Sequence, residues 1–192
     1  MTSNLAFTGF PWLSSFVGES NAKDLMARWR EPHRGFHTYK HLRSVLEAFS
    51  ESEHAFILAS FYHDAVYVPG RRDNEAESAK VLLTHTQGNE DRRIVELAHR
   101  IVLSTADFEH KTDPDEERFF LADCAVLLRH INHLMRYEKE IRLEFSGIPQ
   151  SDYIAGRCSF LEKASLVFPS NAEALLALKN IVQCSASAQH LP

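Results

Sequence analysis

An all-α fold is predicted by three features of this 192-residue sequence. Apolar residues recur at helical spacing, as in residues 40–49, where the repeating positions are Leu42, Val45, Leu46 and Phe49. Glycine and proline are few and fall mainly between segments of helical length. No run of alternating apolar and polar residues, bounded by hairpin turns, indicates a strand.

The remaining helices follow from the same periodicity. Residues 52–67 are apolar almost all round, which predicts a central, buried helix. Further helices are expected at 73–86, 91–104, 115–135, 137–145, 151–167 and 171–183. Ser170 and Asn171 are suitable caps for the last of them. The charged loops at 30–36 and 66–74 are where functional residues are expected to gather.

Length and composition predict a single domain over residues 1–192. A chain of this size buries roughly 70% of the surface that its unfolded state exposes, so a full core is available. The proportions of 44% hydrophobic and 24% charged residues are typical of a soluble globular protein. We expect residues 1–20 to form an N-terminal segment and residues 185–192 to form a disordered tail.

Charge and sequence signals exclude several classes of partner. The formal net charge of −5 gives no general attraction for a nucleic acid polymer. No stretch approaches the roughly 20 apolar residues that span a bilayer, and Gly9 and Pro11 interrupt the apolar N-terminal run of a secretory signal. Three cysteines without a CxxC pair suggest neither a disulfide framework nor a thiolate zinc site. We therefore expect a cytoplasmic protein without a membrane partner; a homo-oligomer stays open.

Metal-ligand side chains interrupt apolar segments at three places. His37 and His41 are four residues apart, which predicts that they share one face of a helix. His63 and Asp64 are adjacent near the end of the central helix, and Asp123 lies among hydrophobic neighbours. A buried carboxylate is costly unless it is paired or binds a metal. Together, His41, His63, Asp64 and Asp123 predict a site for a divalent ion such as Mn²⁺, Fe²⁺, Co²⁺, Ni²⁺ or Zn²⁺.

Each piece also has a simpler interpretation. A His-Asp dipeptide occurs by chance in many proteins, and a surface helix can carry two histidines without binding anything. Asp123 can serve as a cap or as an ion-pair partner of Arg118 or Arg129. The order and separation of the pieces along the chain favour the metal site.

The segments GFHTYKHLRSVL, ASFYHDAVY and FLADCAVL resemble, in this order, the His…His-Asp…Asp signature of the HD superfamily of metal-dependent phosphohydrolases. A group of uncharacterised HD-domain proteins with the pattern EPxRxYHxxxH, FHDxxY, DNExSA and FLDxDL is more similar still. The shared residues are Glu31, Pro32, Arg34, His37, His41, His63, Asp64, Tyr67, Asp73, Asn74, Glu75, Ser78, Thr105, His110, Leu121 and Asp123. The resemblance covers about residues 25–168.

This resemblance implies a single HD-type helical bundle that binds a divalent metal, Mg²⁺ included, and a small phosphate substrate. Four positions depart from the pattern: Phe36 replaces Tyr, Tyr62 replaces Phe, Ala122 replaces an acidic residue and Cys124 replaces Leu. None of the four is a proposed ligand. The change at Ala122 puts in doubt any role of a further carboxylate there.

Site roles follow from the same resemblance and from side-chain chemistry. The region of His37 also resembles cyclic-nucleotide phosphodiesterases, which implies His37 as general acid and His41 as ligand. Asp64 is expected to bind metal and to orient the attacking hydroxide. Arg34 is the candidate to grip a phosphate through its planar fork, or else a solvated loop residue. Glu75 is expected to act as a base or orienter, or as a cap of the helix at 73–86.

Three function classes remain open. The first is a phosphohydrolase acting on a nucleotide or other small phosphate ester. The second is a di-iron oxygenase of the HD type, for which His37 and His110 are the candidate additional ligands; His110 can equally contact a ligand of a single metal. The third is a regulatory module that keeps the metal without catalysis. A zincin protease is disfavoured, because Thr38 stands where HExxH needs its glutamate.

Overall fold

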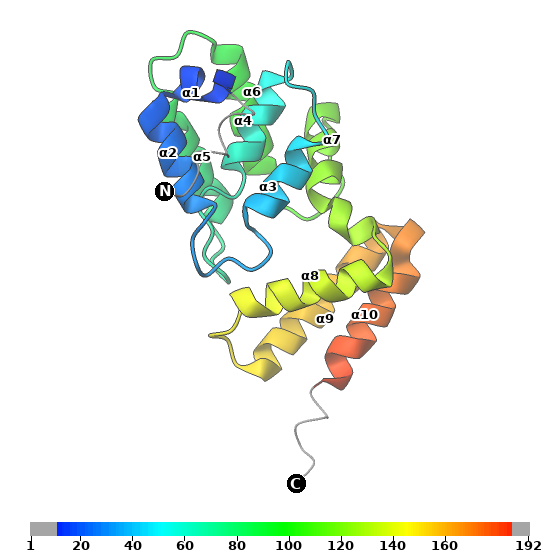
Figure 1. The fold of residues 1–192 in the computed structure, drawn as a ribbon. Helices are drawn as coiled ribbons and strands as arrows, with labels where there is room; N and C mark the ends of the chain where they lie inside the picture. The colour runs from blue at the N-terminus through cyan, green and yellow to red at the C-terminus, as the bar shows by residue number, and fades with distance from the viewer. Residues whose placement is uncertain (1–10, 186–192) are drawn as a thin grey trace. The chain divides into compact units, whose positions relative to one another are not determined.

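The computed structural model describes residues 11–185, and in this part of the chain it contains helices and no strand (Figure 1). The predicted all-α fold class is therefore confirmed. The chain divides into two compact units, residues 1–122 and 123–192. That residues 1–192 form a single domain stays a prediction. The first ten residues of the expected N-terminal segment and residues 186–192 of the expected tail lie outside the described residues.

The first unit is organised around a central helix that is buried on every side. Its elements are α1 (Pro11–Val17), α2 (Glu19–Arg28), α3 (Tyr39–Leu46), α4 (His54–Tyr62), α5 (Asn74–His85), α6 (Arg92–Ser104) and α7 (Pro114–Asp123), of which only Asp123 belongs to the second unit. Every residue of α4 after His54 is buried, and α4 packs against α3, α5 and α6 (Figure 1). The prediction of a central buried helix is confirmed, although α4 is shorter than the range 52–67.

Two helices at the start of the described chain were not expected from the sequence. Leu13 of α1 and Leu25 of α2 are fully buried in the core that also contains α4. Directly after α2, the fully buried Trp29 donates a hydrogen bond from Nε1 to the carbonyl oxygen of Phe61 (2.9 Å). Residues 11–29 are thus an integral part of the first unit.

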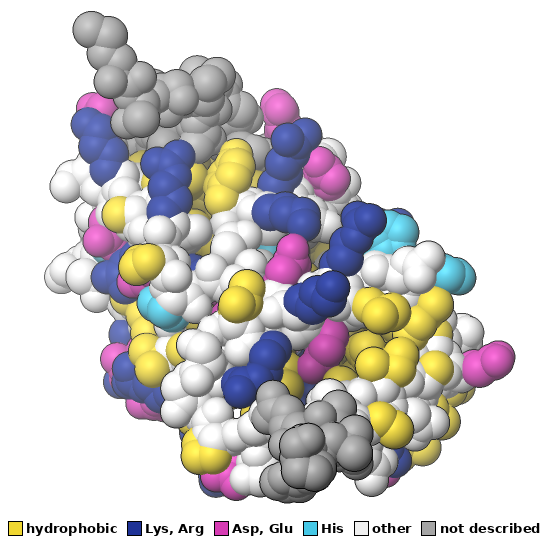
Figure 2. Space-filling view, turned by 60° about the horizontal axis from the view of Figure 1, so that its bottom comes forward, with side chains coloured by type: hydrophobic (Ala, Val, Ile, Leu, Met, Phe, Trp, Pro, Cys, Tyr) yellow, Lys and Arg dark blue, Asp and Glu magenta, His cyan; other side chains and the backbone are white. Residues whose placement is uncertain are grey.

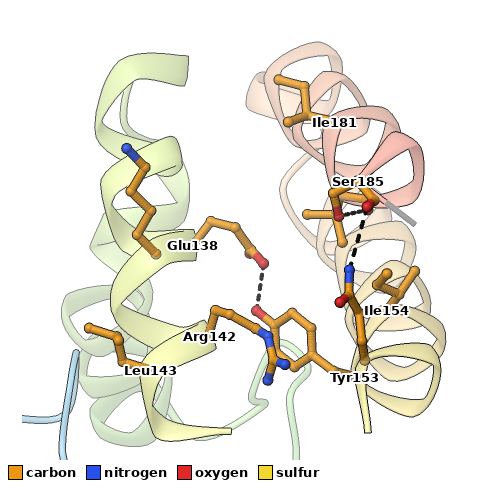
Figure 3. Close-up of a pocket in the computed structure, with 10 residues that line it drawn as sticks. Glu138, Arg142, Leu143, Tyr153, Ile154, Ile181 and Ser185 are labelled. Carbon is orange, nitrogen blue, oxygen red and sulfur yellow. Dashed lines mark hydrogen bonds between the residues drawn. The ribbon is translucent and has the colours of Figure 1, made fainter. Parts of the chain in front are cut away.

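The second unit contains η1 (Cys124–Leu128), α8 (Ile131–Glu144), α9 (Gln150–Val167), η2 (Pro169–Asn171) and α10 (Ala172–Cys184). A groove lies between α8 on one side and α9 and α10 on the other (Figure 3). There Tyr153 donates a hydrogen bond from its hydroxyl to Oε1 of Glu138 (2.5 Å). The second carboxylate oxygen of Glu138 accepts from Nε of Arg157 (2.6 Å), so this partly buried acid is paired with a cation within the unit.

The helix expected at 115–135 is in fact interrupted, and this prediction was wrong. After α7 the chain tightens into the 3-10 helix η1, and Arg129 is extended (φ −86°, ψ 159°) before α8 begins. Asn171 donates from its amide to the carbonyl oxygens of Leu127 (2.7 Å) and Arg129 (3.0 Å). Because this contact comes from a residue more than 40 positions away, apolar periodicity gave no sign of the break.

The surface of the molecule carries both apolar and basic side chains (Figure 2). Among the described residues, no helix combines the length and the apolar character that crossing a bilayer requires.

Candidate metal centre

Three side chains predicted as metal ligands converge in the first unit. They are His41 of α3, His63 at the C-terminal cap of α4, and Asp64, which follows it. The two Nε2 atoms of His41 and His63 are 3.3 Å apart. One carboxylate oxygen of Asp64 lies 3.2 Å from Nε2 of His63 and 3.9 Å from Nε2 of His41. Both histidines are buried and Asp64 is largely so.

The spacing of these atoms fits a shared divalent ion. Ligand atoms that each lie about 2.0–2.2 Å from one metal are roughly 3.0–3.6 Å from one another in tetrahedral or octahedral coordination. Two of the three distances fall in this interval and the third exceeds it by a few tenths of an ångström. Two imidazole nitrogens and a carboxylate oxygen are a donor set that suits borderline divalent ions.

The orientation of the His63 ring is fixed by the backbone of its own helix. Its Nδ1 lies 2.8 Å from the carbonyl oxygen of Ser60, a group that can only accept, so Nδ1 must carry the proton. The lone pair of a neutral His63 is therefore on Nε2, the atom that faces the other two side chains. A ligating histidine commonly has its other ring nitrogen held in this way.

Aromatic side chains surround the two imidazoles. The ring centroid of His63 lies 5.4 Å from that of Trp29 and 5.5 Å from that of Phe119. The ring of His41 lies 4.7 Å from that of Phe36. An apolar wall of this kind restricts solvent and strengthens electrostatic interactions at the group.

The turn that carries Asp64 is held in place by two residues whose role the sequence analysis did not identify. Ser78 of α5 accepts a hydrogen bond from the backbone N–H of Val66 (3.0 Å). Asn74 pairs with Val68 in both directions, accepting from its N–H and donating to its carbonyl oxygen (both 3.0 Å). Both side chains are buried. Their presence in the segment DNEAESA was a usable signal, since small polar residues inside a buried helix face often hold a turn.

His37 lies near the group but not on the helix that carries His41, so the predicted shared helical face was wrong. Thr38 is extended (φ −103°, ψ 177°) and caps the start of α3 by accepting from the N–H of Lys40, so the helix begins at Tyr39, two residues after His37. The His37 ring nevertheless lies 5.7 Å from that of His41 and 4.2 Å from that of Tyr67. The loop between α2 and α3, rather than a helix, therefore positions His37 beside His41.

Arg34 is buried, and its side chain has no exposed surface. The guanidinium donates to Glu31 and to backbone carbonyl oxygens. This arrangement does not favour the predicted role of gripping a phosphate, for which donors must face the substrate.

Glu75, at the start of α5, is a partly buried carboxylate close to the group. Burial is the main reason that its pKa is raised above the ordinary value of 4.5. Its own backbone N–H lowers the pKa, whereas the negative charge of Asp64 raises it further. A carboxylate with a raised pKa beside candidate ligands is suited to proton transfer.

Replacing Glu75 by glutamine is expected to stabilise the metal-free protein at neutral pH. A carboxylate whose pKa is raised by folding costs no stability below about 4.5, its value in the unfolded chain; the cost then grows with pH and is complete once pH exceeds the folded-state pKa. Urea unfolding of both proteins between pH 4 and pH 7.5 measures this difference. The gain of Glu75→Gln should grow as pH rises; a gain that is independent of pH would contradict the assignment.

Asp123 and His110 are the two further residues that the sequence predicted as ligands. Asp123 is the last residue of α7 and the first of the second unit, so its role as a ligand stays a prediction. His110 is exposed, and its Nδ1 lies 2.7 Å from a carboxylate oxygen of Glu117. It is not one of the three clustered residues, and its role in binding a second metal also stays a prediction.

Comparison of the chain with models of known families, with curated proteins and with solved structures found no match. The side chains of the candidate metal centre and the sequence motifs that resemble HD-domain proteins are therefore the features that bear on function.

Proposed function

We propose that this protein is a divalent-metal-dependent phosphohydrolase acting on a nucleotide or another small phosphate ester. The observation that carries the proposal is the convergence of His41, His63 and Asp64, with ligand atoms 3.2–3.9 Å apart in a mostly buried site. Burying a carboxylate costs free energy unless it is paired or binds a metal, which supports a bound ion at this donor set. The reaction class comes from the HD resemblance.

His41, His63 and Asp64 would hold the ion, and the resemblance adds Asp123 as a fourth ligand. Phe119, one helical turn before Asp123 in α7, has its ring against that of His63. This contact makes Phe119 part of the apolar surroundings of the imidazoles. A bound divalent ion supplies Lewis acidity, which polarises a phosphoryl oxygen and lowers the pKa of a coordinated water toward about 7.

The protein's own groups supply the proton transfers. The ring of His37 lies beside that of His41, and its imidazole would hand a proton to the leaving oxygen of the ester. Glu75 would accept a proton from the attacking water or orient it, because its raised pKa makes it a better base than an exposed glutamate. Aromatic rings limit the access of other water molecules.

The proposal is tested by metal analysis followed by an activity screen. Purified protein is stripped with a chelator and titrated separately with Mn²⁺, Mg²⁺, Ni²⁺, Co²⁺, Zn²⁺ and Fe²⁺, and each loaded form is offered a panel of nucleotides and small phosphate esters. We expect one ion per chain and metal-dependent release of phosphate or of a nucleoside monophosphate. The stripped protein should be inactive with every ester.

Two other outcomes would each replace the proposal. Two irons per chain with consumption of oxygen would indicate a di-iron oxygenase. Tight metal binding without turnover of any ester would indicate a regulatory module that keeps the ion. Failure to bind any of the six ions would contradict the metal centre itself.

A further inference from the structure

The guanidinium of Arg34 lies inside the first unit, between the two segments that carry the candidate site. Arg34 belongs to the loop between α2 and α3, and its side chain is fully buried. Its terminal carbon is 5.3 Å from the centroid of the Trp29 ring and 5.4 Å from that of Tyr67. Burying a cation is costly unless its donors are satisfied, so each N–H of the guanidinium needs a hydrogen-bond acceptor.

Five hydrogen bonds leave this guanidinium, which has five N–H groups to give. Nε and Nη2 both donate to one carboxylate oxygen of Glu31 (3.0 and 2.9 Å). Nη1 donates to the carbonyl oxygens of His37 (3.1 Å) and Asp64 (2.9 Å). Nη2 also donates to the carbonyl oxygen of Ala65 (3.4 Å). No donor is left over for a substrate.

The acceptors explain what the arginine does. The carbonyl groups of Asp64 and Ala65 follow the end of α4, where backbone oxygens have no partner within the helix. A buried cation at a helix C-terminus satisfies them and is favoured by the helix dipole. The carbonyl of His37 belongs to the other segment. One side chain thus joins the loop of the candidate general acid to the turn of the candidate ligand.

We propose that Arg34 is a positioning residue of the metal centre, which holds the backbones of His37 and Asp64 at the separation that metal binding needs. The inference rests on the proposed metal site. His33 reinforces the same junction, since its Nε2 lies 2.7 Å from the carbonyl oxygen of Tyr67. Lysine cannot replace this arginine, because a single ammonium carries three donors on one nitrogen and cannot reach both segments in one plane.

The test replaces Arg34 by lysine and measures metal binding rather than turnover. Chelator-stripped wild-type and variant proteins are titrated with Mn²⁺ by calorimetry, and the visible absorption of the Co²⁺-loaded forms is recorded. Removing a group that orients a metal ligand weakens metal affinity by roughly 10- to 100-fold. We expect a loss of this size in Arg34→Lys, together with an altered Co²⁺ spectrum. A purely structural role would lower thermal stability without changing that spectrum.

Arg43→Lys is the matched control. Arg43 is an exposed residue of α3 whose Nε pairs with Glu47 at 3.1 Å, so this variant should bind both ions as the wild type does. Should Arg34→Lys fail to fold, Glu31→Ala removes the carboxylate that aligns the guanidinium. Glu31 is partly exposed, so water can replace its carboxylate as the acceptor, and the same weakening of Mn²⁺ binding is expected.

Unchanged Mn²⁺ affinity and an unchanged Co²⁺ spectrum in the folded Arg34→Lys or Glu31→Ala protein would overturn the inference, provided that Asp64→Ala abolishes binding. Weaker binding of inorganic phosphate with unchanged metal affinity would also overturn it, in favour of a substrate contact. Metal binding that survives in Asp64→Ala would instead refute the proposed metal site. The two failures are therefore distinguishable.

Discussion

Replacing Asp64 by alanine is expected to abolish metal binding while leaving the helical content nearly unchanged. Asp64 supplies the carboxylate of the described group, and its loss leaves only two imidazoles, whose Nε2 atoms are 3.3 Å apart. Its side chain is 15% exposed and follows the end of α4, so its removal opens no cavity in the core. Calorimetric titration with Mn²⁺, metal content after dialysis and far-ultraviolet circular dichroism measure the two effects.

Asp73→Ala is the matched control for this experiment. Asp73 lies nine residues further along the same loop region, is exposed, and pairs with Arg71. Removing it should leave metal affinity unchanged. Asp64→Asn preserves the shape of the side chain without its charge, so we expect it to bind metal much more weakly than the wild type does. Retention of wild-type affinity in Asp64→Ala would show that the ion is held elsewhere.

Apolar periodicity predicted the helices whose core faces are regular. The expected ranges at 73–86, 91–104, 151–167 and 171–183 each match an observed helix to within about two residues. The break at Arg129 escaped prediction, because the residue that compensates for it, Asn171, is remote in sequence. The helices α1 and α2 escaped prediction because α1 begins at Pro11 and α2 directly follows Gly18, and both residue types ordinarily interrupt a helix.

Less of the candidate metal centre than of the helices could be predicted from apolar spacing. The prediction that His41 shares a site with His63 and Asp64 came from the resemblance to HD-domain proteins. Helical spacing could not predict it, because no local rule relates residues 22 positions apart. Spacing misplaced His37, because the cap at Thr38 begins the helix later than a four-residue repeat suggests. The burial of Arg34 depends on Trp29 and Tyr67 closing around it, which composition and spacing do not encode.

The largest effect on stability is expected from Trp29→Ala. Trp29 is fully buried, and truncating a buried tryptophan costs about 3–5 kcal/mol of unfolding free energy. The loss includes the hydrogen bond to Phe61, whose carbonyl oxygen lies in the last turn of α4. Urea unfolding of the metal-free protein, followed by circular dichroism, measures the change. Trp12→Ala is the control, since Trp12 is only partly buried and stacks on His54.

Trp29 also connects the core to the metal centre, because its ring lies 5.4 Å from that of His63 and 5.3 Å from the guanidinium carbon of Arg34. An ion that binds only the folded protein stabilises it by an amount that depends on its affinity. We therefore expect saturating Mn²⁺ to stabilise the wild type and Trp12→Ala equally, and to stabilise Trp29→Ala less. Equal stabilisation of all three proteins would mean that Trp29 supports the fold without influencing the candidate metal centre. A loss below about 1 kcal/mol in Trp29→Ala would contradict its place in the core, because surface substitutions rarely cost more than about half of that.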